Sequence, residues 1–383
     1  MRIHHKTHIL GKISVDTFLK KYWQKKPILI RDAIKNFKSP INEKDLFEII
    51  QNEGVISRLI AYKKGMWQVK HGPFKKSDLF KKLHMPWTVL VQNVNHHLPF
   101  AESFLNLFKF IPYARLDDLM VSFATKKGSV GPHFDSYDVF LFQALGEREW
   151  KISAQKEFSL DKKSAIKIIS NFECENSWVL KPGDMLYLPP NVGHWGISQS
   201  DNCLTYSVGF RAPSVFDIQS KFLDFIQDNL ITNKNDLYKD PNLSKQKNPA
   251  EITSNMIKKI RQTANQLRWN TSLLNTFTGQ FLTEPIESAI FHPPRTMKLE
   301  IFKKNLLIKS LKLNPKTRML FIKTNFYING ECIKSDKKYA LYLKQLASNR
   351  KISLNGNLNK ADLSALGVIL LPLYLSGFAD FIQ

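Results

Sequence analysis

The stretches GPHFD (residues 131–135) and PGDMLYLPPNVGHW (residues 182–195) are the parts of this sequence that say most about its fold. In each of them, glycine and proline mark turns around a short run. His133 and Asp135 are separated by one residue, so both side chains point to the same side of an extended chain. The second stretch turns at its two adjacent prolines and brings His194 to the start of another strand. Together they predict that two imidazoles and one carboxylate face a common interior.

Further short strands lie on both sides of these stretches. They are alternating or continuous apolar runs at 119–124, 139–144, 150–153, 178–180, 185–188 and 204–210. Many short strands separated by glycine and proline turns indicate a β-sandwich or barrel. The spacing from Gly183 to His194 also resembles the second motif of the cupin fold, although Ser198 stands where cupins usually carry asparagine. We therefore predict an α+β protein whose core is a double-stranded β-helix, the jelly roll of cupins.

The chemistry expected of this interior is metal binding. A His-x-Asp triplet alone is weak evidence, because such triplets are common at protein surfaces. A second histidine delivered to the same interior completes the ligand set of non-haem Fe(II) oxygenases, which leaves three coordination positions open. We therefore expect His133, Asp135 and His194 to bind a metal ion.

A buried cation is expected next to this metal site. Residues 138–145 predict an apolar strand, Gly146-Glu147 a two-residue turn, and residues 148–152 the returning partner strand. Arg148 then shares the inward face with Trp150 and Ile152. An unpaired buried charge costs about several kcal/mol, and a planar guanidinium suits a bound carboxylate. The alternative is a structural ion pair between Arg148 and either Asp117 or Asp118.

The composition of the chain changes twice along its length. The first part opens with alternating helix and strand signals, including a helix that Asp16 can cap and that runs to Lys26. Its β-rich remainder ends near Pro213, where helical spacing of apolar residues begins. We expect three domains, at residues 1–212, 213–295 and 296–383.

The second and third domains have their own signals. A helix is predicted to start at Asn248–Pro249 and another to cover residues 271–282. In the third domain, a strand at 319–326 and a turn at Asn329–Gly330 predict a hairpin, and helices follow. This is the pattern of a small α+β module.

Charge and cysteine usage bound the possible partners and the compartment. Lysine and arginine number 56 against 33 aspartate and glutamate, a formal net charge of +23. Such a surface attracts nucleic acid, acidic protein patches or anionic membranes, although compositional bias can explain part of the excess. No run approaches the roughly 18 apolar residues that cross a bilayer, and no apolar core of a signal peptide is present. The three cysteines form no CxxC pair, so we expect a reduced, cytoplasmic protein without contact to a membrane.

Several stretches resemble a known family. They are DDLMVS (117–122), GPHFD (131–135), YDVF (137–140), REW (148–150) and YSVGFR (206–211), preceded by FL (18–19) and YWQKKP (22–27). On these residues the chain resembles the JmjC-type 2-oxoglutarate oxygenases, and specifically the bacterial ribosomal-protein arginine hydroxylases. In that family a JmjC core, a helical dimerisation region and a C-terminal winged helix follow one another. The resemblance is specific over residues 18–211 and architectural beyond them.

The resemblance implies Fe(II) as the metal, and 2-oxoglutarate and O2 as co-substrates. Arg148 would bind the distal carboxylate of 2-oxoglutarate. Ser122, which shares a strand face with Asp118, looks like a further co-substrate contact. Thr205 and Ser207 share one face of the last strand, where they could line the pocket, with Thr205 as a further contact of 2-oxoglutarate, or be satisfied by backbone groups.

A chain of net charge +23 should repel a basic substrate unless the pocket supplies local partners. Our candidates for substrate binding are Asp118, Tyr137, Met120 and Ser207. The carboxylate of Asp118 can pair with a guanidinium, and the ring of Tyr137 can stack on it. The alternative is that Asp118 pairs with Arg115 or Arg148.

The function expected from the resemblance is 3-hydroxylation of an arginine in a large-subunit ribosomal protein, presented on a basic loop. A homodimer and contact with ribosomal RNA through the basic surface are also expected. One alternative is a JmjC oxygenase that acts on another residue, by histidine hydroxylation or lysine demethylation. Another is a cupin-fold module that binds nucleic acid or protein without catalysis, for which the metal ligands and Arg148 would be unnecessary.

Overall fold

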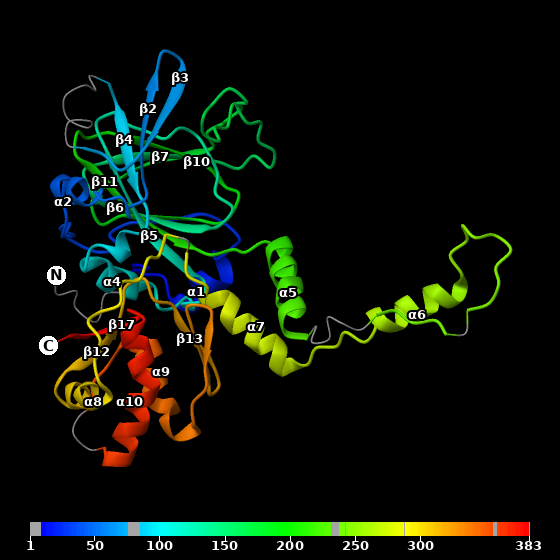
Figure 1. The fold of residues 1–383 in the computed structure, drawn as a ribbon. Helices are drawn as coiled ribbons and strands as arrows, with labels where there is room; N and C mark the ends of the chain where they lie inside the picture. Colours follow the sequence, from blue (N-terminus) through cyan, green and yellow to red (C-terminus); the bar gives the residue numbers. More distant parts are fainter. Residues whose placement is uncertain are drawn as a thin grey trace.

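The computed structural model describes residues 9–75, 85–230, 237–241, 243–286, 288–354 and 358–382. They form a β-domain, a helical arm and a C-terminal α+β domain, which follow one another along the chain (Figure 1). We keep 1–212, 213–295 and 296–383 as the proposed domain limits.

The β-domain consists of two antiparallel sheets. The larger has the strand order β1-β9-β6-β11-β5-β4-β2-β3 and the smaller β10-β7-β8. The strands are β1 (Ile28–Ile30), β2 (Ser57–Lys63), β3 (Met66–His71), β4 (Trp87–Val91), β5 (Leu116–Ala124), β6 (Asp138–Leu145), β7 (Arg148–Ser153), β8 (Asn176–Leu180), β9 (Met185–Leu188), β10 (Gly193–Ser198) and β11 (Cys203–Phe210). Leu141 and Leu186 of the larger sheet pack with Trp150 and Leu180 of the smaller sheet. The two sheets therefore face each other, and the predicted jelly roll is confirmed.

Helices cover the outer face of the larger sheet. They are α1 (Val15–Lys21), α2 (Glu43–Ile49) and α4 (Phe100–Leu105), with the short 3-10 helices η1 (Val94–His96) and η2 (Asn106–Phe108). Phe47 of α2 packs on Phe123 of β5, and Phe104 of α4 packs on Phe142 and Tyr206. Since alternate residues of a strand face opposite sides, the polar residues of β5 and β11 point between the sheets.

The turn at Gly146–Glu147 differs from the prediction. It was expected to close a hairpin, but β6 pairs with β9 and β11, whereas β7 pairs with β8 and β10. The turn thus carries the chain from one sheet to the other. Gly146 has a φ of +66°, and a Cβ there would lie 2.3 Å from the carbonyl oxygen of Asn202. Glycine is required at this crossing.

Two predicted helix starts are corrected by the caps. Helix α1 is capped by Ser14, whose Oγ accepts from the N–H of Thr17, and it ends at Lys21 rather than Lys26. Asp16 lies in its first turn, where a carboxylate favours the helix dipole. The helix expected at Asn248 begins only after Thr253, which caps α6 (Ser254–Ala264).

The helical arm leaves the β-domain after β11. Helices α5 (Val215–Leu230) and α7 (Thr271–Thr283) pack against each other through Phe222, Phe225 and Phe277. Helix α6 extends away from the rest of the molecule (Figure 1) and buries none of its side chains.

The C-terminal domain has its own core. Its helices are α8 (Leu299–Ile308), α9 (Ala340–Asn349) and α10 (Lys360–Leu375), with the 3-10 helix η3 (Lys337–Tyr339), and its strands are β12 (Ser310–Leu313), β13 (Met319–Ile322), β14 (Asn325–Ile328), β15 (Glu331–Ile333), β16 (Lys351–Ile352) and β17 (Ala379–Ile382). The strand expected at 319–326 is two strands, because Lys323 takes a φ of +58° and turns the chain. None of the helices formed by the described residues is long and apolar enough to span a bilayer.

Candidate active site

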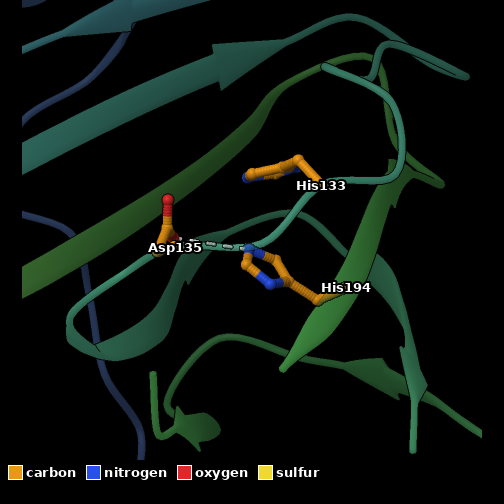
Figure 2. Close-up of side chains that lie close together, drawn as sticks. All are labelled: His133, Asp135 and His194. Atoms are coloured by element: carbon orange, nitrogen blue, oxygen red, sulfur yellow. Dashed lines mark ion pairs between the residues drawn. The ribbon is translucent and has the colours of Figure 1, made fainter. Parts of the chain in front are cut away.

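The three predicted metal ligands meet between the sheets. One ligand atom from each of His133, Asp135 and His194 lies within 4.8 Å of the others. Figure 2 shows them converging from the loop before β6 and from β10. The sequence predicted that His133 lies in a regular strand. In the structure it lies in an isolated β-bridge with His194. Its N–H donates to the carbonyl of His194 (2.9 Å), and the N–H of His194 donates back (2.7 Å).

Backbone hydrogen bonds set the tautomer of both histidines. The Nδ1 of His133 lies 2.9 Å from the carbonyl oxygen of Gly131, and the Nδ1 of His194 lies 3.0 Å from that of Val192. A carbonyl only accepts, so Nδ1 carries the proton and each Nε2 keeps its lone pair. Burial, and then the neighbouring His133, lower the pKa of His194 to about 4. Its ring is therefore neutral at pH 7, as a metal ligand must be.

Arg148 lies at the base of the same space, at the start of β7. It is 2% exposed, and its Nε and Nη2 have no hydrogen-bond partner among the described residues. Its Cζ lies 5.7 Å from the ring of Trp150. Burial alone raises the pKa of the nearby Cys203 thiol, but the Arg148 cation and local hydrogen bonds bring that pKa below its usual value. Arg148 is thus a buried cation with unused donors.

Asp117 does not neutralise Arg148. Its Oδ1 accepts from the Nε of Arg211 at 3.1 Å and from the Nη2 of Arg318 at 3.2 Å. This carboxylate is therefore already paired with two other arginines. The ion pair with Asp117, considered as an alternative from the sequence, is not formed.

Among the described residues, no arginine pairs with Asp118 either. Its Oδ2 accepts the backbone N–H of Asn93 at 2.9 Å, while Arg115 pairs with Asp138 at 3.2 Å. Burial raises the pKa of Asp118 to about 6. A Cβ at Gly209 would lie 3.4 Å from its Oδ1 and 3.6 Å from the ring of Tyr137. Glycine at this position leaves the space between these two side chains free.

One cavity of about 1190 Å³ connects these groups. It is lined by His133, Asp135, His194, Arg148, Ser122, Asp118, Tyr137, Met120 and Ser207. Thr205, the remaining site residue expected from the sequence, is not among the lining residues. It is 1% exposed, and its hydroxyl donates to the Oε1 of Gln143 at 3.0 Å. Its position does not support the predicted contact with 2-oxoglutarate.

Sequence reasoning missed two parts of the cavity wall. Strand β2 contributes Arg58 and Ile60, and the end of α7 with the segment just after it contributes Phe281, Leu282, Glu284, Pro285 and Ile286. Alternation in β2 could have shown which of its residues share a face. It could not have shown that this face borders the metal site, since that depends on the order of strands in the sheet.

The side chains present fit a metal ion and a dicarboxylate. Two imidazoles and one carboxylate suit a divalent transition metal such as Fe(II). The unpaired N–H groups of Arg148 suit a carboxylate that enters the same cavity. A jelly roll with this site defines an Fe(II)- and 2-oxoglutarate-dependent oxygenase of the JmjC class.

Comparison with known proteins agrees with this class. Residues 103–218 match the JmjC domain, and residues 266–380 match the ROXA-like winged helix. The chain is 33% identical over 336 residues to the ribosomal protein uL16 3-hydroxylase of Escherichia coli, which covers 87% of this chain and 88% of that protein. It is 39% identical over 210 residues to a probable ribosomal oxygenase of Haemophilus influenzae, which covers 54% of this chain and 52% of that protein.

A solved structure of a ribosomal oxygenase is similar to this chain over almost its whole length. The Escherichia coli ribosomal oxygenase YcfD, in complex with cobalt and 2-oxoglutarate, is 30% identical with a TM-score of 0.83, over 97% of this chain and 99% of that one. The present chain belongs to the JmjC ribosomal oxygenase family. It is a 2-oxoglutarate-dependent dioxygenase with Fe(II) as its metal.

Proposed function

We propose that this protein hydroxylates the β-carbon (position 3) of an arginine in ribosomal protein uL16. The carboxylate of Asp118 carries this proposal. It faces the same cavity as His133, Asp135 and His194, and no arginine or lysine of the described chain forms an ion pair with it. A partly buried carboxylate that is not paired with a cation favours a cationic guest. Similarity to the uL16 3-hydroxylase over most of both chains supports the same target.

The co-substrate half of the cavity is proposed to work as follows. His133, Asp135 and His194 hold Fe(II). The Nε and Nη2 of Arg148 donate to the distal carboxylate of 2-oxoglutarate, with Ser122 as a further donor. When bound, iron with 2-oxoglutarate and O2 supplies the chemistry that converts C–H to C–OH, while 2-oxoglutarate becomes succinate and CO2.

The substrate half orients the arginine. Asp118 pairs with the guanidinium, the ring of Tyr137 stacks on its plane, and Met120 and Ser207 border the side chain. These contacts hold the β-carbon near the metal and exclude water. The carboxylate favours a cationic arginine over a neutral histidine. The flat ring favours arginine over lysine, because a planar guanidinium can stack on it.

Mass spectrometry of uL16 tests the proposal. We expect the protein with Fe(II) and 2-oxoglutarate to add one oxygen atom to one arginine of uL16. Asp135→Ala should add none. His292→Ala changes an exposed histidine outside the cavity and should behave like the wild type. Oxygen on a histidine, loss of a methyl group from lysine, or full activity of Asp135→Ala would each contradict the proposal.

We also propose a homodimer, formed through the helical arm, in the cytoplasm. Helix α6 buries none of its side chains and exposes Ile257 and Ile260, while α5 exposes Val215, Phe216 and Leu223. Apolar helices of this kind are normally covered by another surface. Sedimentation at micromolar concentration that shows only a 44.3 kDa species would exclude the dimer. The charge of +23 supports, in addition, contact with ribosomal RNA.

A further inference from the structure

The β2–β3 ribbon is an exposed feature of the β-domain. Strand β3 is the last strand of the larger sheet and pairs only with β2 among the described strands. It buries none of its six residues. In Figure 1 the ribbon projects at the top of the molecule, beyond the neighbouring strands. A two-stranded ribbon at the free edge of a sheet is accessible along that edge.

The ribbon carries positive charge without any negative charge. Between Glu53 and Asp78 the sequence contains no aspartate or glutamate. The basic residues in the described part of this segment are Arg58, Lys63, Lys64, Lys70 and Lys75. Neighbouring strands lie about 4.8 Å apart, so cations on both faces of the ribbon act within one Debye length, about 10 Å, of a ligand at its edge. The ribbon therefore attracts an anionic chain.

Its tip also carries accessible rings. Tyr62 is 54% exposed, and its ring centroid lies 4.9 Å from that of Trp67 on the opposite strand. Met66, beside them, is 63% exposed. Exposed aromatic rings between cations are the combination that binds unpaired nucleotides, by stacking on bases and by neutralising phosphates.

The aromatic face of the ribbon continues into the active-site cavity. The cross-strand pairs Tyr62–Trp67, Ile60–Val69 and Arg58–His71 share one face, because they are two residues apart. Arg58 and Ile60 line the cavity. At the other end, a Cβ on Gly131 would lie 2.7 Å from the Trp67 ring, so the ribbon rests on the loop that carries His133. A molecule on this face of the ribbon therefore lies beside the cavity.

We propose that the β2–β3 ribbon binds single-stranded RNA next to the substrate pocket. A basic ribosomal protein would be repelled by this segment, whereas the phosphates and bases of RNA match its cations and rings. That the natural RNA is ribosomal rests on the proposed function. Binding to RNA itself rests on the ribbon alone. The RNA then occupies the basic ribbon, and the arginine loop occupies the adjacent cavity that contains Asp118.

Fluorescence anisotropy with labelled oligouridine of about sixteen nucleotides tests this with the full chain. The test variant is Lys63→Gln/Lys64→Gln/Lys70→Gln. The control is Lys304→Gln/Lys309→Gln/Lys351→Gln, which removes the same charge from exposed residues of the C-terminal domain. We expect the ribbon variant to bind at least about tenfold more weakly and to lower the salt slope by about 2, since each phosphate contact contributes about 0.7. The control should lose less than about threefold.

A second variant separates stacking from charge. Tyr62→Ala keeps every cation and should weaken RNA binding at least about fivefold, with an unchanged salt slope. Equal losses in the ribbon and control triples would overturn the proposal, as would full RNA affinity in Tyr62→Ala. Weaker binding of uL16 with unchanged RNA affinity would assign the ribbon to the protein substrate instead.

A peptide assay keeps this result independent of the proposed function. None of the substituted ribbon residues lines the cavity, so the turnover of an arginine peptide without RNA should be unchanged in all three variants. If the peptide is never hydroxylated but RNA binding still depends on the ribbon, the proposed function fails and the ribbon assignment stands.

Discussion

Arg148 is a residue whose side chain is expected to lower the folding stability and to favour the binding of a carboxylate. Its buried Nε and Nη2 lack partners in the described chain. Each unsatisfied buried donor costs about 1–3 kcal/mol, and more when it is charged. A carboxylate in the cavity would satisfy both donors. The side chain is therefore expected to destabilise the ligand-free protein and to stabilise the complex.

Replacing Arg148 by an apolar side chain of similar length should separate these effects. Arg148→Met is expected to leave the ligand-free melting temperature equal or higher, because the buried charge is gone. It should also weaken 2-oxoglutarate binding about tenfold to over a hundredfold, equivalent to about 1.5–3 kcal/mol. Calorimetry with Co(II) in place of iron measures both quantities.

Lys151→Met is the matched control for this substitution. Lys151 lies on the opposite face of β7, where it contacts Glu149 and the ring of Trp195. Lys151→Met should therefore leave 2-oxoglutarate binding unchanged. An Arg148→Met protein that melts lower and still binds 2-oxoglutarate would show that Arg148 has a structural role.

Asp118 should give substrate binding a pH dependence. Burial raises its pKa to about 6 in the substrate-free protein, so the carboxyl is mostly neutral below that pH. Affinity for an arginine peptide should therefore rise as pH increases through about 6. In Asp118→Asn the affinity should be low and this step absent. Peptide titrations between about pH 5 and 8, with 2-oxoglutarate binding as the reference, measure it.

The folding stability contributed by Asp118 should fall as pH rises, opposite to the affinity for the peptide. The pKa of Asp118 in the folded protein lies above the ordinary value of 3.8, so the folded form binds the proton more tightly. The stability contribution of Asp118 is present below about pH 4 and is lost as pH rises through about 6. Asp118→Asn should therefore gain stability relative to the wild type at pH 7 but not at pH 4. A gain that is the same at both pH values would contradict the shifted pKa.

Among the elements, the pair β7–β10 positions both halves of the co-substrate site. His194 is opposite Ile152, Gly196 is opposite Trp150, and Ser198 is opposite Arg148. The metal ligand and the buried cation are thus separated by the Gly196–Trp150 step. Small changes in this step should alter the distance that 2-oxoglutarate must span.

Gly196→Ala tests this spacing. A Cβ at Gly196 would lie 2.7 Å from the Trp150 ring, so the ring or the strand must move. We expect a loss of about 1–3 kcal/mol in the free energy of unfolding, and weaker binding of Co(II) and 2-oxoglutarate. Gly54→Ala is the control, because no atom of the described residues lies within 4 Å of its Cβ position. Denaturant unfolding that shows equal stability for both variants would argue against tight packing here.

The elements also show what a sequence can predict. Alternation correctly gave the faces of β5 and β7, because the side-chain direction along a strand is local. The predicted pairing of β7 with β6 was wrong. The turn at Gly146–Glu147 crosses between the sheets, and the pairing of β7 depends on strands that are distant in the sequence. Thr205 has the predicted face but lies too deep, with its hydroxyl bound to Gln143. Depth and pairing are properties of the closed jelly roll and have no local signal.

At the scale of the whole molecule, the C-terminal domain contacts the strand that carries the substrate site. Arg318, just before β13, donates to the Oδ1 of Asp117 at the start of β5, and Asp118 is the next residue. Arg211 donates to the same oxygen and to the carbonyls of Leu282 and Glu284, which line the cavity. The C-terminal domain is therefore positioned to affect how Asp118 meets the substrate.

Arg318→Gln should reveal this effect. Asp117 is partly exposed and keeps Arg211, so we expect a loss of only about 0.5–1 kcal/mol in substrate affinity, a twofold to fivefold rise in the KM for an arginine peptide. The KM for 2-oxoglutarate should not change, because Arg148 lies on another sheet. Lys312→Gln is the matched control: it removes the ion pair with Glu102, which joins the same two domains away from β5. If both variants raise the peptide KM equally, the C-terminal domain acts through docking alone. If only Arg318→Gln does so, the contact with Asp117 positions the neighbouring Asp118.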